Sequence, residues 1–300
     1  MTVVRPLFTA YRSMTAPTSR PVSDIEVTYT RLNGAADGHV VAFGQRVPGA
    51  LVVPVRQLGL ESRVELWRAD ELLFGAVTAE ETEPLEALSR AHYARMIEHV
   101  RGAGYPYFLR MWNFVGSINE IEGRERYQLF CAGRHDAFVS AGYHHDVDLP
   151  SASAVGMAGR GVVTYFLASR EAGVQVENPR QVAAYDYPPQ YGPKSPSFSR
   201  ATVWRDVVFV SGTSSVVGHK TVHVGDVHAQ LEETLRNIEI VLAQTGRTLA
   251  NVITAKTYLR RAQDYPSVAA RLAEVFPVNL CLEADICRKD LLIEIECVAR

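Results

Sequence analysis

Two glutamates near the C-terminus, Glu294 and Glu296, have a type and spacing suited to acid–base chemistry. From Leu291 onward the chain is aliphatic and β-branched apart from these two residues and has no Gly or Pro, which predicts a β-strand. Side chains alternate along a strand, so both glutamates would project from one face and Ile293 and Ile295 from the other. An isolated carboxylate is costly to bury, so the glutamate face must meet water, a partner charge or a ligand.

Three basic residues are candidates to bind an acidic ligand. Arg134 lies within the apolar stripe of a helix predicted over 124–138, Lys194 lies in the proline- and tyrosine-rich segment Glu177–Arg200, and Arg288 precedes the last strand. Arg forms bidentate pairs with carboxylates, and a partly buried Arg is usually paired. Each of the three is therefore interpreted either as a ligand-binding cation or as one half of a structural salt bridge.

Polar groups also follow the predicted strand Val207–Ser211. Gly212, Thr213 and Ser214 would present backbone N–H groups and hydroxyls at its end, suitable for a substrate oxygen, although an ordinary Ser/Thr turn has the same composition. Tyr127 shares the apolar side of the helix that carries Arg134. We interpret Tyr127 either as part of a site wall or as a core residue.

Composition limits the possible partners. The formal charge of −2 gives no general attraction to nucleic acid or to an anionic membrane. Met1–Pro21 lacks the apolar core of a signal peptide or membrane anchor, and no apolar run elsewhere approaches the roughly 20 residues of a span. The four cysteines form no Cys-x-x-Cys pair, which favours free thiols in a cytoplasmic enzyme. His144, His145 and Asp146 have no second ligand cluster, so we expect a polar loop and no metal site.

Both halves of the chain have the same order of predicted elements. After a β-rich opening at 22–78, the first half has a helix, a strand, a helix and a strand at 84–104, 107–115, 124–138 and 162–168. The second half starts with the strand Val207–Ser211 and then repeats helix, strand, helix and strand at 225–246, 252–259, 264–276 and 291–299. We therefore predict an α+β fold of two related units, 1–180 and 181–300, joined by a stiff crossover.

The second half resembles the RidA/YjgF-like fold. In that family a strand ending in Ser-Gly precedes two β/α units and the chain ends on a Glu-x-Glu strand, as Val207–Thr213 and Ile293–Ala299 do here. The resemblance implies that the C-terminal unit is a chorismate-mutase-like sheet packed by helices. It also implies that Glu294, the first glutamate of the pair, is the functional one.

A resemblance to the chorismatase family covers more of the chain. Its motifs are matched in order by Arg126–Arg134, Tyr187–Arg200, Ser211–His219 and Ala284–Arg288, followed by the glutamate strand. Chorismatases release pyruvate from chorismate, so the resemblance implies a cavity with cations for two carboxylates, an apolar lining for the ring and one proton donor. No cofactor is implied.

The resemblance also suggests roles for individual residues. Glu294 would protonate the enolpyruvyl group, with Arg134, Tyr127, Lys194, Gly212, Thr213, Ser214, Arg288 and Glu296 in the substrate site. Glu296 stays an alternative acid. Members that form an aromatic product differ from hydrolysing members at a small residue in the 212–215 loop and at a cysteine near the last strand. The presence of Cys281 favours an aromatic product.

We therefore expect 3-hydroxybenzoate, with 4-hydroxybenzoate as a second possibility. The alternatives are a chorismate hydrolase that gives a trans-dihydroxycyclohexadiene carboxylate, a RidA-like imine deaminase, or a module that only binds a metabolite. Imine deaminases carry an Arg shortly after the Pro that precedes their last strands, and Pro277–Cys281 contains no Arg. Because two units in one chain could complete a cleft that RidA-like proteins form between subunits, we expect a monomer.

Overall fold

The computed structural model describes residues 12–13, 27–29, 38–40, 62–69, 71–157 and 159–300. Apart from Arg12 and Ser13, Met1–Pro21 lies outside the described residues, as do parts of the β-rich opening predicted at 22–78. Three short strands before the main units form an antiparallel sheet in the order β1-β3-β2: β1 (Arg12–Ser13), β2 (Val27–Tyr29) and β3 (Gly38–Val40). None of the described helices has both the length and the apolarity that crossing a membrane needs.

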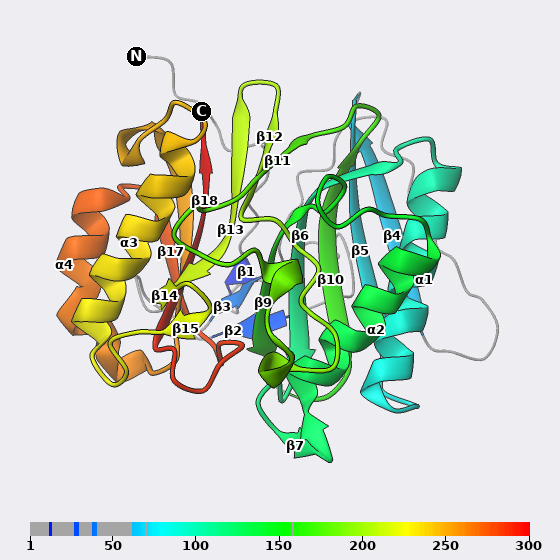
Figure 1. Ribbon diagram of the computed structural model, residues 1–300, viewed down its shortest axis with the longest axis horizontal. Helices are drawn as coiled ribbons and strands as arrows, with labels where there is room; N and C mark the ends of the chain where they lie inside the picture. The colour runs from blue at the N-terminus through cyan, green and yellow to red at the C-terminus, as the bar shows by residue number, and fades with distance from the viewer. Residues whose placement is uncertain (1–11, 14–26, 30–37, 41–61, 70, 158) are drawn as a thin grey trace.

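The first unit is a five-stranded sheet covered by two helices (Figure 1). In chain order its elements are β4 (Ser62–Ala69), β5 (Leu72–Ala79), α1 (Leu85–Gly102), β6 (Tyr107–Gly116), α2 (Arg126–Ser140), β9 (Ser151–Met157) and β10 (Val162–Ser169). The strand order is β4-β5-β10-β6-β9. In α1, Leu85, Leu88, Met96, Ile97 and Val100 are all buried, because their helical spacing places them on the side that faces the sheet.

The second unit is a six-stranded sheet, also with two helices. Its elements are β11 (Val174–Val176), β12 (Ala201–Trp204), β13 (Val207–Ser214), α3 (Val227–Ala243), β16 (Val252–Leu259), α4 (Tyr265–Val275), β17 (Asn279–Glu283) and β18 (Ile293–Ala299). The strand order is β11-β12-β13-β18-β16-β17. Asp226 begins α3 by accepting a hydrogen bond from the backbone N–H of Ala229 at 3.0 Å.

The two units have the same topology. Without β11, the second sheet repeats the first strand for strand, with β12, β13, β18, β16 and β17 in the places of β4, β5, β10, β6 and β9. In both sheets the strands on either side of the second helix, β6 with β9 and β16 with β17, pair in parallel, and the last strand pairs antiparallel with both of its neighbours. The predicted α+β fold of two related units is confirmed.

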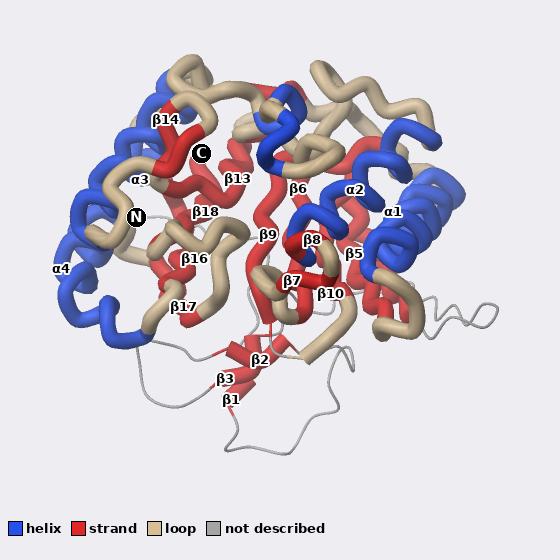
Figure 2. Tube along the Cα trace, turned by 60° about the horizontal axis from the view of Figure 1, so that its bottom comes forward, coloured by secondary structure: helices blue, strands red, loops and turns tan. Residues whose placement is uncertain are grey.

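The sheets face each other and the helices cover their outer faces (Figures 1 and 2). One apolar core lies between α1, α2 and the first sheet, and another lies between α3, α4 and the second sheet. A third core joins the inner faces of the two sheets, where Phe74 and Trp112 of the first unit pack with Phe209 and Leu282 of the second. Residues on the inner face of either sheet can therefore contact both units.

Short connecting elements lie at one end of the facing sheets. They are the hairpin β7 (Ile121–Glu122) and β8 (Arg124–Glu125), the hairpin β14 (Val216–Val217) and β15 (Lys220–Thr221), and the 3-10 turns η1 (Ala184–Asp186) and η2 (Pro189–Tyr191) of the crossover. Two further turns, η3 (Leu249–Asn251) and η4 (Ala262–Asp264), flank β16. The predicted boundary between residues 180 and 181 falls in the crossover Glu177–Arg200. Strand β11 precedes this boundary but pairs with β12 of the second sheet. That boundary stays a prediction.

Candidate active site

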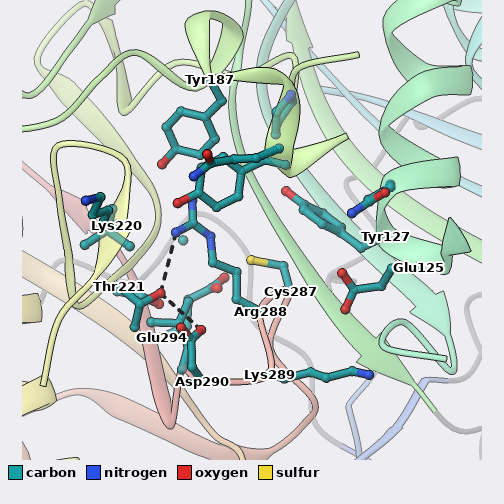
Figure 3. A pocket seen from close by; sticks show the side chains of 18 of the residues that line it. Glu125, Tyr127, Tyr187, Lys220, Thr221, Cys287, Arg288, Lys289, Asp290 and Glu294 are labelled. Atoms are coloured by element: carbon teal, nitrogen blue, oxygen red, sulfur yellow. Dashed lines mark hydrogen bonds between the residues drawn. The ribbon is translucent and has the colours of Figure 1, made fainter. Parts of the chain in front are cut away.

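A cavity of about 660 Å³ lies where the two units and the crossover meet. This volume is in the range of sites that take a small metabolite. The lining residues that decide its chemistry are Glu125, Tyr127, Tyr187, Tyr191, Arg200, Gly212, Ser214, Lys220, Thr221, Cys287, Arg288 and Glu294, most of them drawn in Figure 3. Among the residues that the structure describes, no group of three His, Cys, Asp or Glu side chains is arranged to hold a metal ion.

Glu294 lines the cavity from β18. The residue is 4% exposed, and its carboxyl group has no hydrogen-bond or ion-pair partner among the described residues. Burial, assisted by the nearby negative charge of Glu296, raises the pKa of Glu294 to about 8. The group is therefore mainly protonated at neutral pH and free to donate its proton to a ligand.

Gly212 leaves the space that the Glu294 carboxyl group occupies. A Cβ atom at position 212 would lie 2.1 Å from Glu294 Oε1 and 2.8 Å from its Cδ. A β-bulge between Val210 and Thr213 brings the backbone of β13 to this position beside β18. Any larger residue at 212 would have to displace the carboxyl group.

Glu296 shares the inner face of β18 with Glu294, as alternation predicted, but its surroundings are different. Its Oε2 accepts a hydrogen bond from Arg110 Nη2 at 2.8 Å, and its Oε1 lies 3.0 Å from Lys256 Nζ. Trp112 Nε1 donates to Oε1 at 2.7 Å and Ser153 Oγ donates to Oε2. Burial acts to raise the pKa of Glu296, but the two cations and these hydrogen bonds together bring the pKa below its ordinary value. Glu296 is thus held ionised between the sheets and does not line the cavity.

Arg288 is the best-placed cation of the cavity. Its Nη1 donates to the His219 carbonyl oxygen at 2.9 Å, and its guanidinium carbon lies 4.3 Å from the ring centroid of Tyr191 and 5.1 Å from that of Tyr187. No carboxylate among the described residues lies within ion-pair distance of it. Cation–π contacts, the His219 carbonyl and the Thr221 hydroxyl, which accepts from Nη1 at 3.5 Å, thus orient the guanidinium group and leave it able to bind an acidic ligand.

Arg200 is a second cation of the wall. Its Nη2 donates to the Val182 carbonyl oxygen at 3.0 Å and to the Tyr187 hydroxyl at 2.9 Å. Its acidic neighbour is Glu177, with Nε and Oε2 3.9 Å apart, and burial raises the pKa of Glu177 to about 7. Because this pair is long and Glu177 is partly neutral at pH 7, the positive charge of Arg200 is only weakly compensated.

The structure brings together five of the residues that the sequence suggested. Tyr127, Gly212, Ser214, Arg288 and Glu294 all line the cavity. Two predicted cations lie elsewhere. Arg134 is buried in the first unit, with its guanidinium carbon 5.2 Å from the ring centroid of Tyr93, because the apolar side of α2 faces its own sheet. The Lys194 side chain is 47% exposed and lies 3.8 Å from Asp136 on the surface.

Three other predicted positions are also absent from the cavity wall. Thr213 is the cross-strand partner of Ile295, so its side chain projects toward α3, and its hydroxyl donates to the Ser211 carbonyl oxygen at 2.8 Å. Cys281 is buried in β17 beneath α3 and α4, 2% exposed. Glu296 occupies the ion cluster between the sheets. None of these three residues lines the cavity in the structure, and their roles in the site stay predictions.

Two known families match the chain in sequence. Residues 53–168 match the family described as chorismatase FkbO/Hyg5-like, N-terminal, and residues 193–300 match the family described as endoribonuclease L-PSP. A Streptomyces hygroscopicus protein named 3-hydroxybenzoate synthase is 37% identical over 308 residues, which cover 95% of this chain and 83% of the relative. The chain belongs to the chorismatase family. Another protein of that organism, named chorismatase, is 37% identical over 79% of this chain and 74% of its own length.

The fold of this chorismatase agrees with a solved relative. A crystal structure of a chorismatase has a TM-score of 0.78 and 29% identity, and the match covers 99% of this chain and 100% of the other. The chain is also similar in sequence to the 3-aminoacrylate deaminase RutC of Acinetobacter baylyi, at 34% identity over 37% of this chain and 90% of the relative. Both resemblances expected from the motifs are confirmed.

Sequence reasoning missed several cavity residues of this chorismatase. Cys287 lines the cavity where Cys281 was expected, and burial raises the pKa of its thiol. Arg200 and Tyr187 belong to the crossover motif, but only the folded crossover brings them to Arg288. Glu125 gave no signal beyond its place in the first turn of the helix predicted over 124–138, which in the structure begins one residue after Glu125, at Arg126. For Arg200, a signal was available, since a cation directly before a buried strand needs a partner or a ligand.

Proposed function

We propose that this protein converts chorismate into pyruvate and 3-hydroxybenzoate. Support comes from the relative named 3-hydroxybenzoate synthase, whose match covers 95% of the chain. The observation that carries the proposal is the protonated, unpartnered carboxyl group of Glu294 in a cavity of metabolite size. Release of pyruvate from an enol ether begins with protonation of the enol carbon, which needs such an acid near neutral pH.

Arg288 and Arg200 are the groups that we assign to the two carboxylates of chorismate. Arginine matches the planar geometry of a carboxylate, and both side chains are held in place by neighbours other than a close acidic partner. Tyr187 contacts both guanidinium groups and so couples their positions. Tyr127 and Cys287 also line the cavity and would contact the ring (Figure 3).

Glu294 is the acid in this mechanism. It transfers its proton to the methylene carbon of the enolpyruvyl group, which creates an oxocarbenium-like centre and weakens the bond between the ring carbon and the ether oxygen. When that bond breaks, the ether oxygen keeps the electron pair and becomes the carbonyl oxygen of pyruvate. Glu296 has no proton to give, because Arg110 and Lys256 hold it ionised. Its negative charge supports the protonated state of Glu294.

Two outcomes compete after protonation. The ring hydroxyl can displace pyruvate within the molecule, and the arene-oxide-like intermediate then becomes a hydroxybenzoate. Water can instead attack and give the trans-dihydroxycyclohexadiene carboxylate. We favour the hydroxybenzoate because a cysteine near the last strand accompanies aromatic products in the chorismatase resemblance, and Cys287 is the cysteine that lines the cavity. The 3-isomer is favoured by the relative's name, and 4-hydroxybenzoate is the second candidate.

We also infer that the enzyme acts as a monomer in the cytoplasm. One chain supplies cavity residues from both of its units, so no second copy is required to complete the cavity. No disulfide joins any of the four cysteines, which is the usual state of thiols in a reducing compartment. Size-exclusion chromatography with light scattering would test the monomer.

The experiment is to incubate the purified protein with chorismate, measure pyruvate with lactate dehydrogenase and NADH, and identify the ring product by chromatography against standards. We expect pyruvate and 3-hydroxybenzoate in equal amounts. Folded protein that releases no pyruvate would overturn the proposed activity, and binding of chorismate without turnover would favour a metabolite-binding module. Glu294→Gln should abolish turnover and keep the fold, and a near-normal rate in that variant would exclude Glu294 as the acid.

A further inference from the structure

Glu125 is a second carboxylate of the cavity, and the fold does not account for it. It occupies the N-cap position of α2, but its side chain makes no capping hydrogen bond. Among the described residues, its carboxylate receives one hydrogen bond, from Asn119 Nδ2 at 3.3 Å, and no ion pair. A half-buried carboxylate that faces a cavity with so few partners is free to exchange a proton with a ligand.

Glu125 and Glu294 come from different units. Glu125 ends β8 of the first unit, and Glu294 lies on β18 of the second. In the close view they lie on either side of Cys287, and Lys289 extends on the side of Glu125 (Figure 3). A ligand in the cavity would therefore meet one carboxyl group on each of two sides.

The proposed reaction needs acid and base groups on two sides of the substrate. In chorismate the ether oxygen on ring carbon 3 and the hydroxyl on ring carbon 4 project from opposite faces of the ring. We propose that Glu125 is the general base that accepts the proton of the ring hydroxyl. This inference rests on the proposed function and names a further catalytic residue for it.

The proton transfers balance over one turnover. Glu294 protonates the methylene carbon. The oxygen on ring carbon 4 then bonds to ring carbon 3 as its proton passes to Glu125, and the bond from carbon 3 to the ether oxygen breaks to release pyruvate. Glu125 next returns its proton to the epoxide oxygen as the bond from carbon 4 to that oxygen breaks. Glu294 takes the proton from carbon 3, which makes the ring aromatic and restores both carboxyl groups.

The other acidic and basic groups of the wall are less suited to this task. Asp290 accepts a hydrogen bond from the Thr221 hydroxyl at 3.1 Å. Lys220 and Lys289 carry ammonium groups, which have no lone pair to accept a proton at neutral pH. Glu296 is enclosed in its ion cluster. Apart from Glu294, which already has the role of the acid, Glu125 is the wall carboxylate with the longest hydrogen bond and no ion pair.

The test compares Glu125→Gln and Glu125→Asp with a matched control, Glu120→Gln. Glu120 precedes the same hairpin, is about half exposed and pairs with Arg160 at 2.8 Å outside the cavity. We expect Glu125→Gln to lower kcat about 100-fold, the usual loss when a general base is removed. KM should stay within about threefold, because the interaction lost acts in the transition state. Thermal unfolding would verify that each variant folds.

The pH profile separates a base from a merely structural residue. Wild type should lose kcat on the acid side as Glu125 takes up a proton, Glu125→Asp should keep this acid limb at a lower rate, and Glu125→Gln should lack it. A Glu125→Gln variant with near-normal kcat, or one that keeps the acid limb, would overturn the role of Glu125. Wild type that releases no pyruvate would instead overturn the proposed function itself.

Discussion

Replacing Glu294 by glutamine should stabilise the folded protein, and the gain should grow as the pH rises. In the folded protein the pKa of Glu294 is raised by burial to about 8, whereas an unburied glutamate has a pKa of 4.5. A carboxyl group with a raised pKa favours folding fully below the unfolded pKa, and this contribution is lost as the pH rises through the folded pKa. Glutamine has the same shape and does not ionise, so the variant escapes the loss.

The size of the effect follows from the two pKa values. Between pH 4.5 and pH 8, each pH unit costs wild type about 1.4 kcal/mol of unfolding free energy relative to the variant. From pH 6 to pH 8, the advantage of Glu294→Gln should therefore grow by about 2 kcal/mol, since titration is half complete at the upper limit. That difference is a substantial fraction of the roughly 5–15 kcal/mol by which a protein domain is usually stable.

Urea unfolding at pH 6, 7 and 8 measures this difference, with the slope checked for equality between the two proteins. Glu296→Gln is the matched control on the same face of β18. It should be destabilised by about 3–5 kcal/mol at all three pH values, because Arg110 and Lys256 lose their buried partner. A pH-independent difference between wild type and Glu294→Gln would refute the protonated state of Glu294 and, with it, the source of the catalytic proton.

Two further predictions concern position and charge in the cavity. Gly212→Ala should lower kcat about 100-fold, because the new Cβ displaces the Glu294 carboxyl group by an ångström or more. The control is Gly102→Ala, whose new Cβ meets nothing within 4 Å. Equal kcat values in the two variants would exclude the steric effect. Arg288→Met should raise KM for chorismate about 10- to 100-fold, as expected for loss of a charged hydrogen bond, whereas Arg134→Met should leave KM unchanged. Steady-state kinetics on both variants measures the two KM values. A larger rise in Arg134→Met than in Arg288→Met would refute the assignment of Arg288 to a substrate carboxylate.

The predictable part of the site was the part that depends on periodicity. Alternation along a strand predicted that Glu294 and Glu296 share one face of β18, and helical spacing predicted a helix over 84–104, where α1 lies. Periodicity does not reveal, however, which side chains of other elements pack against that face. The two glutamates differ because Arg110 and Lys256, distant in sequence, converge on one of them only.

The predicted site residues that lie away from the cavity do so for local physical reasons. Arg134 lies on the side of α2 that packs on its own sheet, while the cavity lies at the start of that helix, so an unusual residue in an apolar stripe indicated burial without indicating a site. Thr213 was assigned to a loop, but β13 extends to Ser214, and strand alternation then turns its side chain away. Cys287 lies in an irregular segment where no period can predict its direction.

The ion cluster around Glu296 has a consequence for how the two sheets dock. Its charges come from β6 of one sheet and from β16 and β18 of the other, so they meet in a single alignment. An apolar interface would tolerate a slip of one residue pair, roughly 7 Å along a strand. Here such a slip would leave buried charges unpaired, at a cost of about 3–5 kcal/mol. The cluster therefore fixes the alignment of the two sheets, and this alignment brings Glu125 and Glu294 to the same cavity.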